Sequence, residues 1–309
     1  MTNMAAVTSR VWARKTFGSA ELGDERRTRR LVKVAADLAD SFGASLSGAS
    51  VTSAAQEGAY RLARNPSVEP EQIAEAGFFA TVERARGCRT VLALEDTTSL
   101  SYRHSVCDEL GDIGAPAHTP ACGFLVHSVL LVDAETSHTL GLVEQRYWTR
   151  DFDERGERSR RRPYEEKESF KWERATQALR ERFGDGMCRV ISVCDREADL
   201  YQYLATKIVH AERFVVRACF SRGLDDGYLW QKMEQAREVM RVVVDVPQRA
   251  GRPARQARLS IRKAMLDRVA GYCALSPLGF RSSGAKRISA VSQDLAFRYR
   301  PLAGMMFCR

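Results

Sequence analysis

Apolar residues recur along this chain first with the spacing of helices and later with the spacing of strands. From Trp12 to about Asn65 they recur every three or four positions, which predicts a helical region. One helix is expected to begin just after Asp24, whose side chain suits an N-cap, and a second to run over residues 53–63. A third amphipathic helix is predicted over residues 70–86.

Two short aliphatic runs later in the chain each end in an aspartate. Residues 90–94 are followed by Glu95 and Asp96, and residues 190–194 are followed by Asp195. Apolar runs of this length suit strands that are buried on both faces of a sheet. Because functional groups in open α/β sheets gather beyond the carboxyl ends of such strands, we expect Asp96 and Asp195 to meet.

The remaining pattern predicts a mixed α/β protein. Residues 190–194, a helix over 196–209 and a strand over 213–217 form a βαβ unit, which requires a parallel pair of strands. Further strands are expected at 124–132, 139–146, 239–246 and 257–262, and a further helix at 165–183. From about Ser276 the periodicity disappears.

Composition adds a basic excess to this picture. The formal net charge is +9, and arginine suits phosphate because its planar fork binds two oxygens. The excess favours nucleic acid, although an anionic membrane or plain solubility would also account for it. The 8 cysteines contain no C-x-x-C pair, no secretory signal opens the chain and no window resembles a membrane span, so a reduced cytoplasmic protein is expected.

Basic side chains concentrate on the predicted helix that follows Asp24. We expect this helix to contact DNA phosphates, although a solvated basic face explains the same pattern. On the helix over 53–63, Gln56 and Tyr60 could contact bases or sugars or simply form helix surface. His127, in the middle of a predicted strand, is interpreted as a packing residue. The residues predicted to bind DNA from these helices are Arg26, Arg27, Arg30, Lys33, Gln56, Tyr60 and Arg61.

Several segments resemble one known family. Residues 94–104, Leu-Glu-Asp-Thr-Thr-Ser-Leu-Ser-Tyr-Arg-His, resemble the first-aspartate segment of the transposon-five-type transposases, a group within the insertion-sequence-four family of bacterial DDE transposases. The likeness recurs in family order at 126–131, 166–169, 193–199 and 212–217, while 22–28 and 54–61 look like the family's DNA-binding region. The resemblance covers about residues 10 to 262.

The resemblance implies both a fold and a chemistry. The fold would be a ribonuclease-H-like α/β core with an inserted, incomplete β-domain, preceded by a helical domain that binds transposon ends. The family excises DNA with Mg²⁺ and joins it to a target as a dimer, so the implied partners are double-stranded DNA and a second subunit, in a bacterial cytoplasm at the nucleoid. Asp96 and Asp195 would be catalytic carboxylates that hold Mg²⁺, as paired metals about 3.5–4 Å apart require. Thr97, Thr98, His104 and Arg217 would lie near the metals or the DNA.

The family's third carboxylate has no counterpart in this sequence. It is a glutamate within a Tyr-x2-Arg-x3-Glu-x6-Lys signature, and no glutamate follows Glu238 here. We therefore expect a truncated copy, with a frame-shifted tail, that cleaves DNA poorly or not at all. A non-enzymatic protein that binds transposon ends and a relic without a stable fold remain the alternatives. The expected domains are 1–68 for DNA binding, 69–236 for the incomplete core, 237–275 for the partial β-domain and 276–309 for a poorly ordered tail.

Overall fold

The computed structural model describes residues 8–102, 110–113, 122–150, 162–224, 227–249, 251–266, 288–292 and 305–308. The chain divides into two compact units, which are residues 1–89 with 130–145, and residues 90–129 with 146–309. The predicted class is confirmed, because helices fill the amino-terminal region and a mixed sheet follows it. The expected domain limits at residues 68, 236 and 275 remain predictions.

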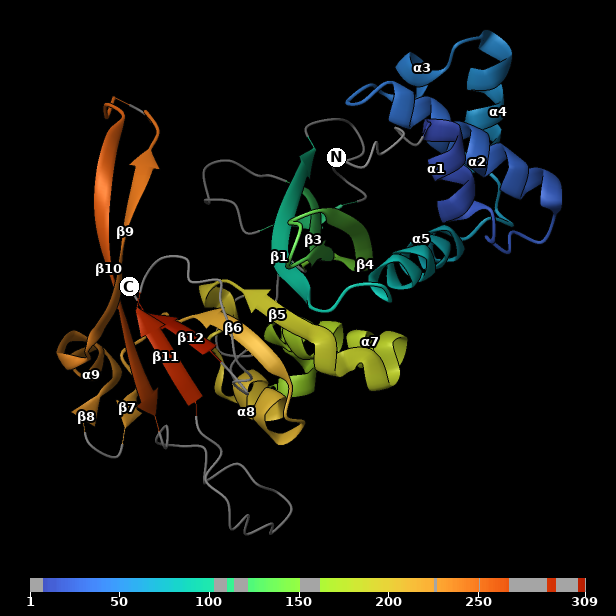
Figure 1. The fold of residues 1–309 in the computed structure, drawn as a ribbon. Coiled ribbons are helices and arrows are strands. Elements are labelled where there is room, and N and C mark those ends of the chain that lie inside the picture. The colour runs from blue at the N-terminus through green and yellow to red at the C-terminus, as the bar shows by residue number, and fades with distance from the viewer. Residues whose placement is uncertain are drawn as a thin grey trace. The chain divides into compact units, whose positions relative to one another are not determined.

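Helices occupy the amino-terminal part of the first unit (Figure 1). Their bounds are α1 Ser9–Phe17, α2 Glu25–Asp40, α3 Leu46–Ala49, α4 Ser53–Ala63 and α5 Pro70–Ala85. Asp24 caps α2 as predicted, since its Oδ1 accepts a hydrogen bond of 2.8 Å from the Arg26 amide. Thr52 caps α4 in the same way, through the Ala55 amide at 3.1 Å.

The core of this unit is small and aliphatic. Leu22, Leu31, Leu62 and Ala76 are buried together, which joins α2, α4 and α5. Burial along α5 does not follow the single apolar face of the amphipathic helix predicted over residues 70–86, because Phe79 is 57% exposed while Phe78 is buried. The cause is that α5 buries residues around most of its circumference, so no single apolar stripe marks its inner side.

Among the described residues, ten strands form one mixed sheet. Its order is β2-β3-β1-β5-β6-β12-β11-β10-β9, with β4 paired to β3. The bounds are β1 Val91–Tyr102, β2 Gly111–Asp112, β3 Cys122–Asp133, β4 Thr139–Trp148, β5 Val190–Cys194, β6 Arg213–Arg217, β9 Glu238–Val246, β10 Arg255–Leu266, β11 Ile288–Ser292 and β12 Met305–Cys308. A separate pair consists of β7 Gly223–Leu224 and β8 Gly227–Tyr228.

The centre of the sheet is parallel. Strands β1 and β5 pair in parallel, and so do β5 and β6, which confirms the predicted βαβ unit. The expectation that the first strand stops at Asp96 was wrong, because β1 continues to Tyr102. Pairing with β5 does stop at Glu95, but β3 lies on the other side of β1 and supports the polar continuation of the strand.

One face of these parallel strands is covered by helices. The segment before α7 Lys171–Phe183 forms two 3₁₀ turns, Tyr164–Glu166 and Glu168–Phe170, and α8 Tyr201–Val209 follows a third 3₁₀ turn at Arg196–Ala198. The buried cluster here combines side chains from α7, α8, β5 and β6, among them Trp172, Tyr203, Cys194 and Phe214. This covered face is the buried side of the sheet.

The last described elements form a ribbon and two short strands. Strands β9 and β10 make the long antiparallel ribbon in Figure 1, which follows α9 Leu229–Gln235. The sequence after residue 276 carried no strand signal, yet β11 and β12 add to the sheet between β10 and β6. These stretches are too short for periodicity to reveal them. No helix within the described ranges is both long and apolar enough to cross a membrane.

Candidate nucleic-acid interface and carboxylate site

The register of the parallel strands ends one residue before each of three predicted site residues. Glu95 of β1 pairs with Cys194 of β5, and Cys194 pairs with Val216 of β6. The next position on each segment is Asp96, Asp195 and Arg217, and all three residues are exposed. Residues in register on neighbouring parallel strands, about 4.8 Å apart, project from the same face of a sheet. We call Asp96, Asp195 and Arg217 the carboxylate row.

Each aspartate of the carboxylate row uses one oxygen to fix its own backbone. Asp96 Oδ1 accepts a hydrogen bond of 2.8 Å from the Thr97 amide, and Asp195 Oδ1 accepts one of 2.8 Å from the Glu197 amide. The Oδ2 atoms of two adjacent exposed carboxylates are then hard oxygen ligands of the kind Mg²⁺ prefers, and Mg²⁺ keeps several waters besides. The donor set fits a magnesium ion, and the metal site remains a prediction.

The other residues predicted for this site differ in their placement. The Thr97 hydroxyl projects to the covered face, where it is 3.0 Å from His127 Nδ1. Thr98 is exposed and alternates back to the face of Asp96. His104 lies outside the described residues. No cluster of three or more His, Cys, Asp or Glu side chains that could hold a metal occurs among the residues the structure describes.

Polar side chains lie buried beneath the carboxylate row, and of these the sequence singled out only His127, as a packing residue. Glu95 and His127 are 3% and 2% exposed, and Glu95 Oε2 is 3.9 Å from His127 Nε2. Cys194 Sγ is 3.3 Å from the Tyr203 hydroxyl. Burial, followed by the negative charge of Glu95, raises the pKa of the Cys194 thiol well above its usual value, so the thiol stays protonated. Glu95 and Cys194 follow from strand alternation once the register is known, since each lies one residue before an aspartate of the row.

Charged side chains also connect the start of α7 to the residues after Asp195. Lys171 Nζ is 3.0 Å from Glu197 Oε2 and 3.8 Å from Glu168 Oε1, and Glu168 in turn accepts two hydrogen bonds of 2.6 Å from Arg150. Burial would raise the pKa of Glu168, but the hydrogen bond and charge of Arg150 outweigh it and lower the pKa. These pairs hold the 3₁₀ turn after Asp195 to α7.

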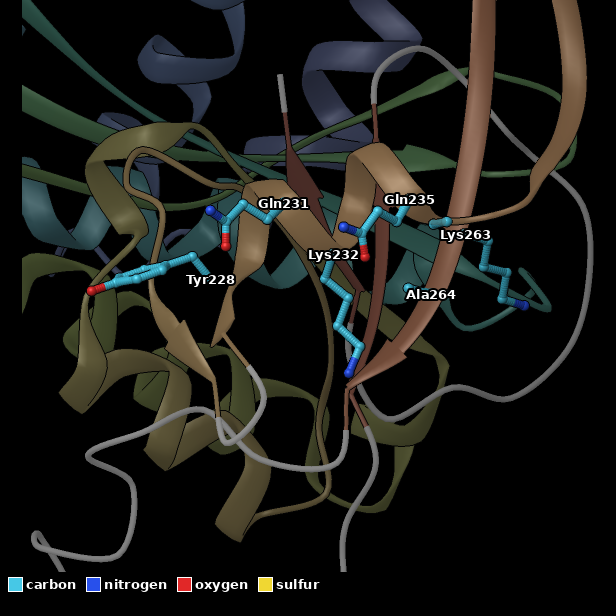
Figure 2. A pocket seen from close by; sticks show the side chains of 7 residues that line it. Tyr228, Gln231, Lys232, Gln235, Lys263 and Ala264 are labelled. Atoms are coloured by element: carbon cyan, nitrogen blue, oxygen red, sulfur yellow. The ribbon is translucent and has the colours of Figure 1, made fainter.

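A polar cavity of about 340 Å³ lies apart from the carboxylates, against α9 and β10. Its lining includes Tyr228, Gln231, Lys232, Gln235, Lys263 and Ala264. In Figure 2, the side chain of Lys263 extends away from the other labelled side chains. The two lysines therefore do not converge on one point, and none of the predicted site residues lines this cavity.

The basic side chains of α2 are mostly exposed and weakly paired. Arg26 has a side chain 86% exposed, with its Nε 4.0 Å from Asp24, and Lys33 Nζ is 2.8 Å from Asp37 one turn away. Arg29 pairs with Glu25 at 3.5 Å. Exposed pairs of this kind are worth less than about 1 kcal/mol, so a phosphate can replace the carboxylate.

Arg27 differs from its neighbours because its guanidinium is bound within the fold. Its Nη1 donates to the Leu22 carbonyl at 2.8 Å and to the Ser67 carbonyl at 3.3 Å. These bonds tie the start of α2 to the segment after α4. The geometry gives Arg27 a structural role, and its predicted contact with DNA remains untested.

Arg30 links α2 to the basic side of α4. A Cβ at Gly58 would collide with the Arg30 guanidinium, so the glycine lets this side chain lie against α4. Arg61 lies three residues after Gly58 and therefore on the same side of the helix, where it pairs with Glu57 at 2.7 Å. Tyr60 and Gln56 are half-buried, and the Arg64 guanidinium lies 5.4 Å from the Tyr60 ring centre. Arg30 and Arg61 thus both lie on the side of α4 that carries Gly58.

Comparison with known families assigns this helical region. Residues 9–68 match a family model described as Transposase DNA-binding. The match spans α1 to α4 and includes every residue predicted above to bind DNA from α2 and α4.

The match favours DNA contact over simple solvation as the explanation of the basic face of α2. It supports a transposase and DNA as its partner. The carboxylate row lies outside the matched residues, so the match says nothing of its chemistry.

Proposed function

We propose that this chain is a transposase of the DDE type, in which residues 9–68 bind transposon-end DNA while Asp96 and Asp195 hold Mg²⁺ for strand cleavage and transfer. The observation that carries the proposal is the match of residues 9–68 to a transposase DNA-binding domain. Adjacent parallel strands that present two exposed aspartates support the catalytic part and a ribonuclease-H-like core. As in the family it resembles, the chain would act as a dimer on paired ends and a target.

Each member of the carboxylate row has a chemical task in this proposal. Asp96 and Asp195 bind the metal through Oδ2, while their Oδ1 atoms stay bonded to backbone amides. When bound, Mg²⁺ activates the attacking oxygen and stabilises the leaving oxygen of the phosphodiester. Arg217 follows Val216, the register partner of Cys194, and supplies a planar cation for a phosphate oxygen of the DNA.

The same residues predict weak catalysis. Among the described residues two carboxylates stand at the proposed metal site, and residues 239–309 contain no glutamate. A missing ligand removes one metal position and several kcal/mol of transition-state stabilisation. The second candidate function is therefore a non-catalytic protein that occupies transposon ends and competes with a complete transposase.

DNA binding is tested by fluorescence anisotropy of the full chain on a labelled duplex at several salt concentrations. The logarithm of affinity should fall linearly with the logarithm of salt concentration. Arg26→Ala and Lys33→Ala should each reduce the steepness of that line by about 0.9, because each removes one phosphate contact. Arg86→Ala, an exposed arginine paired with Glu83 outside residues 9–68, is the matched control and should leave the line unchanged. Binding that does not depend on salt, or that Arg86→Ala weakens equally, would refute the proposed interface.

Cleavage is a separate assay on the same duplex with Mg²⁺. We expect few nicks or hairpins, and fewer still with Asp96→Asn. Robust cleavage that Asp96→Asn abolishes would establish the catalytic function and contradict the expected weak activity. DNA binding without any Asp96-dependent cleavage would favour the non-catalytic alternative.

A further inference from the structure

The buried side chains beneath Asp96 are arranged around a single imidazole. His127, on β3, contacts both residues that flank Asp96 on β1. Its Nδ1 is 3.0 Å from the Thr97 hydroxyl, and its Nε2 is 3.9 Å from Glu95 Oε2. The imidazole thus bridges the positions immediately before and after the exposed aspartate.

This bridge lies where β1 loses its pairing with β5. Hydrogen bonding between β1 and β5 ends at Glu95, one residue before Asp96. From that point the Thr97 side chain is held to β3 by His127, while the Thr97 amide donates to Asp96 Oδ1 at 2.8 Å. Thr97 therefore orients the Asp96 carboxylate, and the side chain of Thr97 is itself fixed by His127 on the covered face.

The chemistry of the buried groups specifies how the imidazole is oriented. Neither carboxylate oxygen of Glu95 has a hydrogen-bond partner among the described residues, and a buried carboxylate without compensation is costly. His127 Nε2, which also has no hydrogen-bond partner among them, faces Glu95 Oε2 at 3.9 Å. A proton on Nε2 would offset part of that cost by its attraction to the carboxylate, and it would leave Nδ1 to accept the Thr97 hydroxyl proton. Trp172 packs edge-on against the imidazole, with the two ring centres 4.7 Å apart, and restricts the rotation of the imidazole.

We propose that His127 is a positioning residue for the carboxylate row: it holds Glu95 and Thr97 from the covered face and thereby fixes Asp96 between them. The proposal rests on the proposed metal-binding function of Asp96. It gives Glu95 and Thr97 a different role from that of direct contact with metal or DNA. His127 acts through Thr97, much as outer-shell partners orient metal ligands in other proteins.

The test compares variants of the full 309-residue chain that remove single atoms of this bridge. Thr97→Val deletes the hydroxyl with little change in shape, and Thr97→Ser retains it. Thr81→Val is the matched control, because Thr81 is 1% exposed and its hydroxyl donates to the Gly77 carbonyl within α5. This hydroxyl takes no part in the bridge. Asp96→Asn defines how much of the measured metal binding belongs to the site.

Titration calorimetry with Mn²⁺ as the probe gives the first readout. We expect Thr97→Val to weaken the Asp96-dependent binding by about 3- to 10-fold, the size of one lost hydrogen bond or outer-shell contact. Thr97→Ser and Thr81→Val should stay within about twofold of the parent chain, and the thermal midpoints of the two valine variants should agree. A Thr97→Val affinity equal to that of Thr81→Val would overturn the proposal.

Hydrogen exchange separates failure of this proposal from failure of the metal site. If the parent chain shows no Asp96-dependent Mn²⁺ binding, the metal part of the proposed function fails, and exchange at residues 95–98 decides the positioning role. Faster exchange there in Thr97→Val but not in Thr81→Val would support the bridge. Equal exchange in both variants would refute it. His127→Asn, whose side-chain oxygen can replace Nδ1 as acceptor, should restore slower exchange relative to His127→Leu.

Discussion

Replacement of Arg27 by alanine separates structural from DNA-binding arginines on one helix. Arg27 and Arg26 are neighbours in sequence, but their guanidinium groups have different surroundings. That of Arg27 donates to the carbonyls of Leu22 and Ser67, whereas the side chain of Arg26 is 86% exposed. The two alanine variants remove the same charge and should give opposite results in two assays.

The magnitude follows from the two hydrogen bonds. The partly buried bond to Leu22, at 2.8 Å, involves a charged donor and contributes about 1.5 to 3 kcal/mol, whereas the exposed bond to Ser67, at 3.3 Å, adds little. Arg27→Ala should therefore destabilise the helical unit by about 2 kcal/mol, a decrease of roughly 10 °C in midpoint for a unit of this size. Arg26→Ala should change stability by less than about 0.5 kcal/mol.

Thermal unfolding and salt-dependent DNA binding of the full chain provide the two measurements. Below its unfolding midpoint, Arg27→Ala should retain the salt dependence of the parent chain, while Arg26→Ala should reduce its steepness by about 0.9. Faster hydrogen exchange in the segments around Leu22 and Ser67 would confirm that the destabilisation is local. An Arg27→Ala chain with the parent midpoint and a reduced salt dependence would show that Arg27 contacts phosphate, contrary to the structural argument.

Two further predictions concern carboxylates. The hydrogen bond from the Thr136 hydroxyl lowers the pKa of Asp133 below its unfolded value of 3.8. The stability that this bond adds to the turn is therefore fully present above pH 3.8 and is lost as the pH falls through the lower pKa of the folded state. Protection of that turn in hydrogen exchange, normalised for pH, should therefore fall below about pH 4 and become independent of pH in Asp133→Asn. Asp199 is buried and bonds Arg222, so Asp199→Asn should cost about 3 kcal/mol or more in urea unfolding, part of which Arg222→Met should recover.

The sequence predicted elements well where their limits depend on local chemistry. The bounds of α4 and β6 agree with the expected 53–63 and 213–217. A capping threonine and a proline just beyond the carboxyl end define α4, and both act within a few residues of chain. The start of α2 after Asp24 has the same local origin.

Prediction failed where a distant partner decides the outcome. Polar residues after Glu95 suggested that the strand stops there, but pairing on the side of β3 extends β1 to Tyr102. The sequence also did not show that the Arg27 guanidinium is bound within the fold, because its two carbonyl partners become adjacent only when α2 and the segment after α4 pack together. The predicted contact of Arg27 with DNA stays a prediction. Charge along a helix identifies a basic surface, but it does not tell which of its side chains is already bound within the fold.

The four residues Glu95, Asp96, Thr97 and Thr98 illustrate why the chemistry of a strand has to be assigned by face. The resemblance places Asp96, Thr97 and Thr98 near metal or DNA, but successive side chains on a strand point to opposite faces. Asp96 and Thr98 are exposed, whereas Glu95 is buried and Thr97 reaches His127 on the covered face. Asp96 and Thr98 therefore lie on the exposed face, where the metal site is proposed, while Glu95 and Thr97 lie on the covered face. A substitution at Thr97 should then affect metal binding through the position of Asp96. A substitution at Thr98 should act directly on the metal or DNA proposed to bind at the exposed face.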